Sequence, residues 1–288
     1  MSSGADWMET ETLRPLAARE FAEIRTLARR AFGLDLKPGK EELVAARLRR
    51  LASSAGCRSY QEFYRRVLED ATGEALAAMI DALATNHTAF LREPDHFDFL
   101  RHTAIQALGP RRDLEVWSAA CSTGEEVWTL AFVLNDAVPS RRIRITGTDI
   151  SRKALAVAER AAYTAERCAG LPAAWLSRYF AREDGAGQAY RIRPEIRAQA
   201  AFFRQNLVEP FALRRRFPLI FCRNAMIYFD AETQQRVAAS LAAALEPGGY
   251  LFVGHAESLT RCSLSLEYVR PAVYRKPLKR EGGWSRSS

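Results

Sequence analysis

The sequence has no run of apolar residues that approaches the roughly 18 needed to cross a membrane. Its first residues, Met-Ser-Ser-Gly-Ala-Asp, lack the basic segment followed by an apolar one that marks a secretory leader. Its five cysteines are scattered and include no Cys-x-x-Cys pair, so they indicate neither a zinc site nor a disulfide framework. We therefore expect a soluble, cytoplasmic protein with reduced cysteines, without membrane insertion and without a metal.

The chain is rich enough in apolar residues to form a sizeable core, because 48% of its 288 residues are hydrophobic, and its length suffices for two domains. A net charge of +8 indicates an anionic partner but does not choose among nucleic acid, membrane and acidic protein. Between Arg25 and Arg66, eleven basic residues accompany four acidic ones. Arg47 and Arg50 lie three apart in this stretch and would share one helix face. The stretch is either a solvated surface or a docking site for an acidic partner.

Residues 13–84 show the apolar spacing of three and four that predicts amphipathic helices. Turn residues at Gly33, Gly39, Gly56 and Gly73 separate the apolar groups, and no strand pattern interrupts them. We therefore predict an all-α domain over residues 1–84. Residues 85–94 would form the connection to the next domain, and apolar residues between positions 97 and 108 predict one further helix.

The stretch from Leu114 to Leu134 predicts a strand, a tight turn and a helix in succession. Val116, Trp117, Ala119 and Ala120 give a buried, β-prone run, and the turn Cys121–Gly124 consists of small residues that let a ligand approach the backbone closely. The helix that follows begins with acidic residues, which suit the positive end of its dipole. A second strand pattern ends on Asp149 and leads into another helix. Such units open a doubly wound sheet.

Two features of this unit favour S-adenosylmethionine (SAM) as its ligand. The turn lacks the complete Gly-x-Gly-x-x-Gly pattern of dinucleotide-binding proteins. An acid at the tip of the second strand, about 20 residues beyond the turn, can accept the hydroxyls of a nucleoside ribose. Carboxylates repel phosphate, whereas SAM carries a sulfonium, an ammonium and a ribose but no phosphate. A plain α/β crossover whose turn binds nothing is the alternative.

The remainder of the chain predicts an α/β domain with an insertion. Residues 163–205 break the rhythm with a short helix, a Gly-rich turn at Glu183–Gln188 and alternating runs typical of antiparallel strands. Strand, helix and strand patterns then follow at 217–222, 231–245 and 249–254, and two closing strands precede a frayed end from Lys279. We therefore predict an α/β fold, with a Rossmann-like domain over residues 95–288 and a small β-subdomain inserted at about 163–205.

Four stretches, in this order, resemble the CheR-type chemotaxis receptor methyltransferases, which use SAM to esterify glutamate side chains on bacterial chemoreceptors. They are Thr85–Arg92, Trp117–Glu126, Ile220–Asp230 and Pro247–Ser258. The resemblance extends over nearly the whole chain. It implies a helical N-terminal domain joined to a Rossmann-like SAM domain with a small inserted β-subdomain, in agreement with the elements predicted above.

The resemblance also implies an activity, protein-glutamate O-methyltransferase, with S-adenosylhomocysteine as the second product. The partner would be the acidic, helical cytoplasmic domain of a methyl-accepting chemoreceptor, and a receptor C-terminal peptide would be a further ligand of the β-subdomain. A monomer is expected. The residues carried over by resemblance are Asn86, Thr88 and Arg92 in the cofactor and reaction site, Glu126 and Asp149 at SAM, Asn206 and Leu207 near the adenine, Arg223 and Asn224 at the floor of the site, and Tyr228 near the methyl donor. Arg92 and Tyr228 are the candidate catalytic residues, which would hold and orient the reacting carboxylate.

Two other functions stay open on the residues alone. A basic helical domain on a SAM-binding fold suits a nucleic-acid methyltransferase on charge. The sequence has no Asn-Pro-Pro-Tyr-type motif and no basic stretch interleaved with aromatics, so we expect no nucleic-acid partner. A SAM-sensing adaptor without turnover is the second alternative, and the presence of Arg92 and Tyr228 disfavours it. At single positions, Asn86 and Thr88 would also suit a helix cap.

Overall fold

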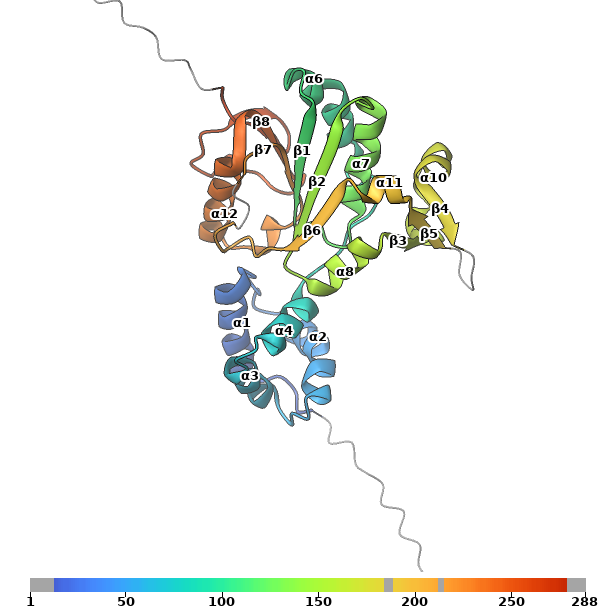
Figure 1. The fold of residues 1–288 in the computed structure, drawn as a ribbon. Helices are drawn as coiled ribbons and strands as arrows, with labels where there is room; N and C mark the ends of the chain where they lie inside the picture. Colours follow the sequence, from blue (N-terminus) through green and yellow to red (C-terminus); the bar gives the residue numbers. More distant parts are fainter. Residues whose placement is uncertain (1–12, 184–188, 212–214, 279–288) are drawn as a thin grey trace, which may run out of the picture. The chain divides into compact units, whose positions relative to one another are not determined.

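The structure is a computed structural model that describes residues 13–183, 189–211 and 215–278. The chain divides into two compact units, one up to Ala84 and one from Thr85 onward. The first unit is helical, and the strands of the described chain all belong to the second (Figure 1). Within the described residues, the helices are too short or too polar to span a membrane.

The described residues of the first unit form four helices: α1 (Ala18–Phe32), α2 (Glu41–Ser54), α3 (Tyr60–Glu69) and α4 (Glu74–Leu83). Their apolar spacing places one face of each helix in a shared core that contains Ile24, Leu48 and Ile80. Gly33 ends α1 in the left-handed conformation, with φ 76°, and the Ser59 hydroxyl caps α3. The predicted all-α domain is confirmed by these helices.

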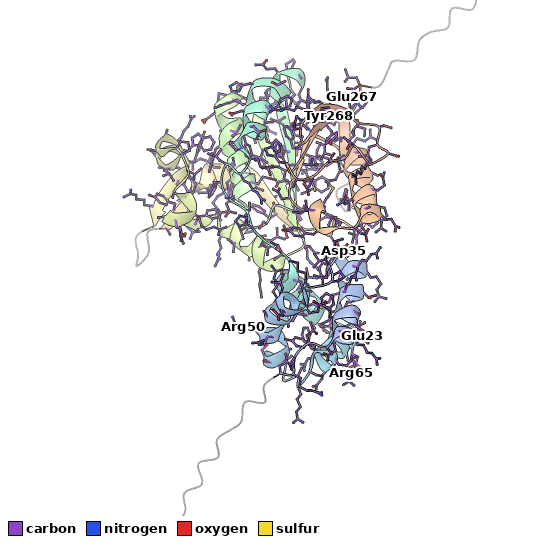
Figure 2. All side chains as sticks on the ribbon, turned by 180° about the vertical axis from the view of Figure 1, so that it is seen from behind. Glu23, Asp35, Arg50, Arg65, Glu267 and Tyr268 are labelled. Carbon is purple, nitrogen blue, oxygen red and sulfur yellow. The ribbon has the colours of Figure 1, made fainter. Side chains whose placement is uncertain are left out.

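Exposed arginines of this helical unit lie on α1, α2 and α3. Arg49 and Arg50 of α2 and Arg65 of α3 are exposed, and Figure 2 labels Arg50 and Arg65 on their helices. Arg47 is only half-exposed, and its guanidinium donates a hydrogen bond of 2.7 Å to the carbonyl oxygen of Leu83 at the end of α4. Because Arg47 joins α2 to α4, it differs from Arg50, which presents its charge to solvent.

A seven-stranded sheet forms the centre of the second unit, in the order β6-β2-β1-β7-β8-β10-β9. Figure 1 labels its strands from β6 to β8. Its strands are β1 (Asp113–Ala119), β2 (Arg142–Asp149), β6 (Ala200–Arg204), β7 (Phe217–Cys222), β8 (Leu245–Val253), β9 (Glu267–Arg270) and β10 (Val273–Arg275). The strands from β6 to β8 pair in parallel, and β10 and β9 extend the sheet with antiparallel pairs. This arrangement confirms the predicted α/β, Rossmann-like class.

Helices cover both faces of this sheet. α7 (Glu125–Ala137) and α8 (Arg152–Arg160) make right-handed crossovers on one side, so α12 (Ala231–Ala244), which runs toward the opposite edge, covers the other. Side chains alternate accordingly, since Val116 of β1 packs with the α7 cluster and Trp117 packs with the cluster that includes α12. Burial on both faces explains the near-continuous apolar runs of the parallel strands.

The strand order reverses between β1 and β7. From β1 the chain moves through α7 to β2 and on to β6, whereas from β7 it moves through α12 to β8 on the other side. Ligands of doubly wound sheets bind outside the carboxyl ends of the strands at such a switch point. The segments that begin at Ala120 and Arg223 therefore border the expected crevice.

The insertion forms a separate antiparallel sheet of three strands, in the order β3-β5-β4. It comprises β3 (Ala162–Thr164), α9 (Ala165–Cys168), α10 (Ala173–Tyr179), β4 (Phe180–Glu183) and β5 (Ala189–Ile192), and α11 (Pro194–Arg197) leads back to the main sheet. We call β3 to β5, with α9 and α10, the β-subdomain. Residues 184–188 of the predicted Gly-rich turn lie outside the described residues, as does the predicted frayed end from Lys279.

Strand β6 differs from the sequence prediction, which grouped residues 200–205 with the insertion. It pairs in parallel with residues 145–149 of β2 and forms the edge of the main sheet. Phe202 packs on Trp128 of α7, with ring centroids 5.6 Å apart, while Phe203 is 51% exposed. An edge strand with one covered face shows the same alternation as an antiparallel strand, so the pattern could not separate the two.

One helical run precedes β1 in the second unit. It consists of α5 (Pro94–Phe99), a single π-helical turn, η1 (Leu100–Ala104), and α6 (Ile105–Ala107). It confirms the further helix predicted from the apolar residues at 97–108. After β7, a short 3-10 turn, η2 (Met226–Tyr228), carries Tyr228.

Candidate functional site

Asp149, at the end of β2, binds the turn between β1 and α7 through hydrogen bonds. Its buried carboxylate accepts hydrogen bonds from the backbone N–H groups of Ser122, at 2.8 Å, and Ser151, at 2.9 Å. Gly124 closes the turn with φ 93°, and a Cβ there would lie 2.7 Å from that of Ala158. Only glycine fits this position, because both the conformation and the space exclude a side chain.

The segment before α5 lies against the same strand ends. The Asn86 amide donates to the Ser151 hydroxyl at 3.4 Å, and the Asn86 carbonyl oxygen accepts from the Ser122 hydroxyl at 3.1 Å. Two serines that the sequence analysis did not single out thus connect Asn86 with Asp149, which was predicted to share a site with it.

Arg223, directly after β7, lies at the centre of a buried ion network. Its side chain is 2% exposed. The guanidinium donates to Glu93 at 2.9 Å, to Glu126 at 3.1 Å and also to the carbonyl oxygen of Arg92. It lies 5.4 Å from the ring centroid of Phe97, over the ring. One cation therefore binds the start of α7 and the segment before α5 to the end of β7.

Glu93 has partners on both carboxylate oxygens. Besides Arg223, the Asn224 amide donates to it at 3.1 Å and the backbone N–H of His255 at 3.3 Å. Burial alone would raise the pKa of Glu93, but the charge of Arg223 and these hydrogen bonds outweigh burial and lower the pKa to about 2. Glu93 is therefore ionised at neutral pH and balances the buried cation.

Glu126 is shared between Arg223 and β1, because the Ser118 hydroxyl donates to its other oxygen at 2.7 Å. Burial raises the pKa of Glu126, and the charge of Arg223 opposes the shift. Glu126 and Asp149 make the region around the β1 turn acidic. Each carboxylate can accept several hydrogen bonds, so these residues fit a ligand that carries positive charge and ribose hydroxyls. SAM is such a ligand.

Glu257 holds the loop after β7 through hydrogen bonds to its backbone. Its carboxylate is 7% exposed and accepts from four backbone N–H groups. The donors are Asn224 at 2.9 Å, Met226 at 2.6 Å, Ile227 at 3.2 Å and Gly254 at 2.6 Å. Burial raises the pKa of Glu257, and the four N–H bonds oppose that shift. The loop that carries Arg223, Asn224 and Tyr228 is therefore built around one buried acid.

Most of the described non-glycine residues with positive φ lie around the candidate site. Among the described residues, seven non-glycine residues have positive φ, and five of them border this site: Leu91, Glu93, Ala120, Ser122 and Asn224. Each such residue costs of order 1–3 kcal/mol, and clusters of them are typical of functional sites. At Gly254, a Cβ would lie 2.4 Å from the Asn224 amide nitrogen, so this glycine makes room for the strained residue.

Other predicted site residues lie nearby with different contacts. The Arg92 guanidinium donates to the carbonyl oxygen of His87 at 2.8 Å, which closes the turn before α5. The Asn206 amide donates to Glu209 at 2.8 Å, and Leu207 is buried in the core cluster on the α12 side of the sheet. Thr88 and Tyr228 are half-buried.

Glu93, His96 and His255 have the composition of a metal site, since one ligand atom of each lies within 4.8 Å of the others. The Arg223 guanidinium donates to the Glu93 oxygen that lies 3.4 Å from His96 Nδ1. A bound cation would therefore sit beside a buried positive charge. That a metal is not required stays a prediction.

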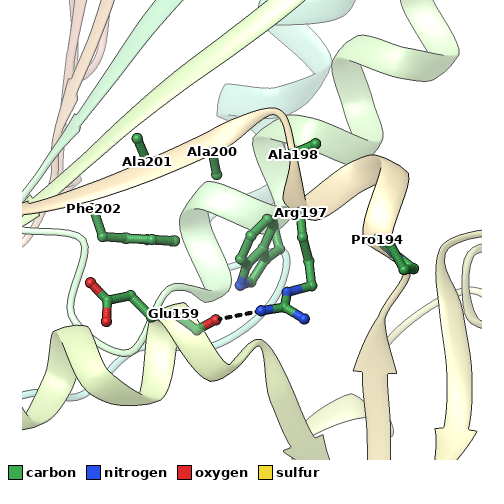
Figure 3. Close-up of a pocket in the computed structure, with 8 residues that line it drawn as sticks. Glu159, Pro194, Arg197, Ala198, Ala200, Ala201 and Phe202 are labelled. Atoms are coloured by element: carbon green, nitrogen blue, oxygen red, sulfur yellow. Dashed lines mark hydrogen bonds between the residues drawn. The ribbon is translucent and has the colours of Figure 1, made fainter.

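An open pocket of about 410 Å³ lies elsewhere, at the edge of the main sheet (Figure 3). It is lined by Trp128, Glu159, Pro194, Arg197, Ala198, Ala200, Ala201 and Phe202. The Arg197 guanidinium points to the backbone carbonyl oxygen of Glu159 and donates to it at 3.3 Å (Figure 3). None of these eight residues belongs to the predicted site, so this pocket does not identify the cofactor crevice.

Comparison with known proteins decides the family. The family model described as "CheR methyltransferase, SAM binding domain" matches residues 86–273, and the one described as "CheR methyltransferase, all-alpha domain" matches residues 19–84. The chain belongs to the CheR methyltransferase family. The ion network around Arg223 and the acidic β1 turn both lie within its SAM-binding domain.

Members of the CheR family match along most of their length. The chemotaxis protein methyltransferase of Klebsiella aerogenes is 36% identical over 276 residues, which cover 94% of this chain and 94% of that protein. The chemotaxis protein methyltransferase of Escherichia coli (strain K12) is 34% identical over 263 residues, which cover 90% of this chain and 91% of that protein. The resemblance stated from the four sequence stretches is confirmed.

Three residues of the candidate site were not predicted from the sequence. Ser118 and Glu257 lie inside two of the four stretches, and Glu93 directly follows a third. The sequence contained a usable signal for Glu257, which is an acid in a stretch with three glycines, Gly248, Gly249 and Gly254. The partners of Glu93 and Glu257, Arg223 and four backbone N–H groups, are distant in sequence and became apparent only in the fold.

Proposed function

We propose that this chain transfers the methyl group of SAM to glutamate side chains of bacterial chemoreceptors. The products would be glutamate methyl esters and S-adenosylhomocysteine. The observation that carries the proposal is the buried Arg223 network at the switch point of a CheR SAM-binding domain. The names of the relatives, chemotaxis protein methyltransferases, support chemotaxis as the setting.

The acidic β1 turn would hold the cofactor. Asp149 would accept the ribose hydroxyls, and Glu126 would favour the cationic part of SAM through its charge. Asn86 and Thr88 would border the cofactor from the segment before α5, and Asn206 and Leu207 would lie near the adenine. Arg223 and Asn224 would form the floor, where Arg223 fixes Glu126 in place. We propose no metal in this reaction.

The substrate supplies its own nucleophile. A glutamate side chain has a reference pKa of about 4.3, so it is ionised at neutral pH and needs no general base. SAM supplies an electrophilic methyl group on a sulfonium sulfur, which leaves as the neutral thioether of S-adenosylhomocysteine. What remains for the protein is to align and desolvate the carboxylate, and positioning can lower a barrier by roughly 7–11 kcal/mol in favourable cases.

Arg92 and Tyr228 would orient the reacting carboxylate. Both lie on segments that the Arg223 network fixes, since Arg223 donates to the Arg92 carbonyl oxygen and Glu257 holds the loop that leads to Tyr228. A guanidinium and a phenol are donors that suit a carboxylate. For Arg92, this role requires its guanidinium to leave the His87 carbonyl or to share its other N–H groups with the substrate.

The remaining parts would serve the protein partner. Residues 1–84 would dock the acidic, helical cytoplasmic domain of a methyl-accepting chemoreceptor. Residues 85–94 would link residues 1–84 to the methyltransferase domain, residues 95–288. The insertion, at about 163–205 in the sequence prediction, would bind a receptor C-terminal peptide. We propose that the protein acts as a monomer.

The proposal is tested by incubating the protein with labelled SAM and receptor-containing membranes. The expected product is labelled receptor whose label is released by mild base, because methyl esters hydrolyse and methylated bases do not. Base-stable label on nucleic acid would replace the proposal by a nucleic-acid methyltransferase. Normal SAM binding without any transfer to receptor would favour an adaptor.

A further inference from the structure

The β-subdomain holds the tip of the turn between β1 and α7. The Tyr163 hydroxyl, on β3, donates a hydrogen bond of 2.8 Å to the carbonyl oxygen of Thr123. The Arg167 guanidinium, on α9, donates to the Thr123 hydroxyl at 2.6 Å and forms an ion pair with Glu125. Two side chains of the insertion therefore bind a turn of the main domain on both sides of Gly124.

The contact with Glu125 is a partly buried ion pair. Glu125 is 1% exposed, and a buried carboxylate is costly unless it is paired. Its partners are Arg167 and the Thr123 hydroxyl, which donates to it at 2.8 Å. Arg167 also lies over the Tyr163 ring, with its Cζ 5.1 Å from the ring centroid. Loss of Arg167 would leave an uncompensated charge one residue from Glu126.

The turn has no space to relax toward the β-subdomain. A Cβ on Gly124 would lie 3.0 Å from the Tyr163 hydroxyl as well as against Ala158. Tyr163 is 1% exposed, and its ring packs edge-on against Phe90 with centroids 5.1 Å apart. Burial raises the pKa of Tyr163 well above its ordinary value, so its hydroxyl stays a donor. The position of the turn thus depends on β3 and α8 as well as on β1.

The β-subdomain also holds the other end of α7, through similar chemistry. Arg178 of α10 pairs with Asp136 at 2.9 Å, and the Trp175 indole donates to the same carboxylate at 2.8 Å. Glu125 begins α7 and Asp136 lies near its end, about 16 Å away along the helix axis at 1.5 Å per residue. The pair of Arg178 and Asp136 therefore offers a matched control for the pair of Arg167 and Glu125.

We propose that Arg167 and Tyr163 are positioning residues for SAM, which act by fixing Thr123 and Glu125 and, through them, the acidic turn. This inference rests on the proposed function, because it takes the turn between β1 and α7 as the cofactor site. It makes β3 and α9 of the β-subdomain part of the cofactor machinery. A ligand that displaces the β-subdomain would then change SAM affinity.

Calorimetric titration of the full chain with SAM tests the proposal. Arg167→Ala should weaken SAM binding roughly tenfold and Tyr163→Phe about threefold, the scale of one charged and one neutral hydrogen bond. Arg178→Ala should stay within about twofold of the unchanged protein, because it breaks the contact at the far end of α7. Equal losses in Arg167→Ala and Arg178→Ala would overturn the proposal, since they would reflect general loosening of the β-subdomain.

A double-mutant cycle with Glu125→Gln provides a readout specific to the pair. The double variant Arg167→Ala, Glu125→Gln leaves no unpaired charge in the turn. Most of the SAM affinity that is lost in Arg167→Ala alone should therefore return in the double variant. Additive losses would overturn the pairing argument. Should Arg167→Ala fail to fold, Tyr163→Phe decides the question, because it removes one hydroxyl and keeps the packed ring.

Asp149→Ala separates this inference from the proposed function. If SAM binding falls strongly in Asp149→Ala and is unchanged in Arg167→Ala and Tyr163→Phe, the cofactor site stands and the positioning role is overturned. If Asp149→Ala also binds SAM normally and unfolds at the normal temperature, the cofactor site itself is misplaced. If SAM affinity falls in Asp149→Ala and in Arg167→Ala but stays normal in Arg178→Ala, both the cofactor site and the positioning role are supported.

Discussion

At the scale of single residues, the proposed role of Tyr228 can be tested against an exposed tyrosine, Tyr268, as a control. Tyr228 is half-buried beside the candidate site, whereas Tyr268 of β9 is 58% exposed (Figure 2). If the Tyr228 hydroxyl orients the reacting carboxylate, Tyr228→Phe should lower kcat for receptor methylation roughly tenfold and change SAM affinity little. Steady-state kinetics with calorimetry would measure both, and Tyr268→Phe should leave both unchanged. A loss of SAM affinity equal to the loss of rate would instead place Tyr228 in the cofactor pocket.

His96 should make stability depend on pH. Burial, and then the charge of Arg223, lower its pKa to about 4, although Asp95 and Glu93 oppose the shift and His255 adds to it. In the unfolded chain a histidine titrates near pH 6.5, so between about pH 6.5 and 4 only the unfolded state binds the proton. The stabilisation is therefore complete near neutral pH and is lost as the pH falls through this window, by roughly 3 kcal/mol.

Denaturation followed by tryptophan fluorescence at pH 7 and pH 4.5 would measure this effect, because Trp117, Trp128 and Trp175 all lie in the second unit. His96→Leu should lose most of the pH dependence of unfolding, while His102→Leu, at an exposed position, should keep it. Equal pH dependence in the unchanged protein and His96→Leu would show that other groups are responsible.

The residue scale also shows where sequence reasoning reaches its limit. Asn86 and Asp149 were predicted from motifs, and the structure joins them through Ser122 and Ser151. Arg223 was predicted only as the floor of the site. Its partners could not be predicted, because the ion pair with Glu93 spans 130 positions and depends on the packing of α5 against the sheet.

At the scale of elements, the loop after β7 depends on Glu257. A glutamine there would have one acceptor oxygen and an NH₂ group that faces N–H donors, so part of the four-donor cradle would be unsatisfied. We expect Glu257→Gln to destabilise the protein by about 1.5–3 kcal/mol, the scale of hydrogen bonds to a charged group. Methylation should fall further than stability alone explains, because the loop carries Arg223 and Tyr228.

Thermal unfolding and receptor methylation at a temperature where both proteins are folded would test this expectation. Glu267→Gln, at the exposed strand β9, is the matched control and should change neither quantity (Figure 2). A folded Glu257→Gln with full activity would show that the loop holds its shape without the carboxylate.

Elements were predicted better than their assembly. The helices of the first unit and the strands β1, β2 and β7 follow from apolar periodicity, which local burial dictates. The place of β6 did not follow, because Phe202 must find Trp128, and that contact joins residues 74 positions apart. Pairing partners in parallel sheets are set by such distant contacts, whereas the strand itself is set locally.

At the scale of the whole molecule, charge and chemistry are divided between the two units. The proposed cofactor residues belong to the second unit, and the densest basic stretch belongs to the first. Electrostatic attraction acts over a Debye length of about 8 Å at physiological ionic strength, so exposed arginines affect the encounter with an acidic partner more than the reaction itself. The two functions should therefore be separable by mutation.

Reversal of charge on α2 would test the docking role. The sequence pointed to Arg47 with Arg50, but Arg47 holds the end of α4, so Arg49→Glu with Arg50→Glu is the cleaner change. We expect the KM for receptor to rise several-fold and its salt dependence to flatten, while SAM affinity stays the same, because the lost interactions are screened surface attractions.

Arg112→Glu with Arg142→Glu makes the same change in net charge at exposed positions beside the starts of β1 and β2, away from the proposed site, and should leave receptor kinetics unaltered. If both pairs raise the KM equally, the effect belongs to net charge and α2 is a solvated surface. If only the α2 pair does so, this face of the helical unit is where the acidic receptor helices dock.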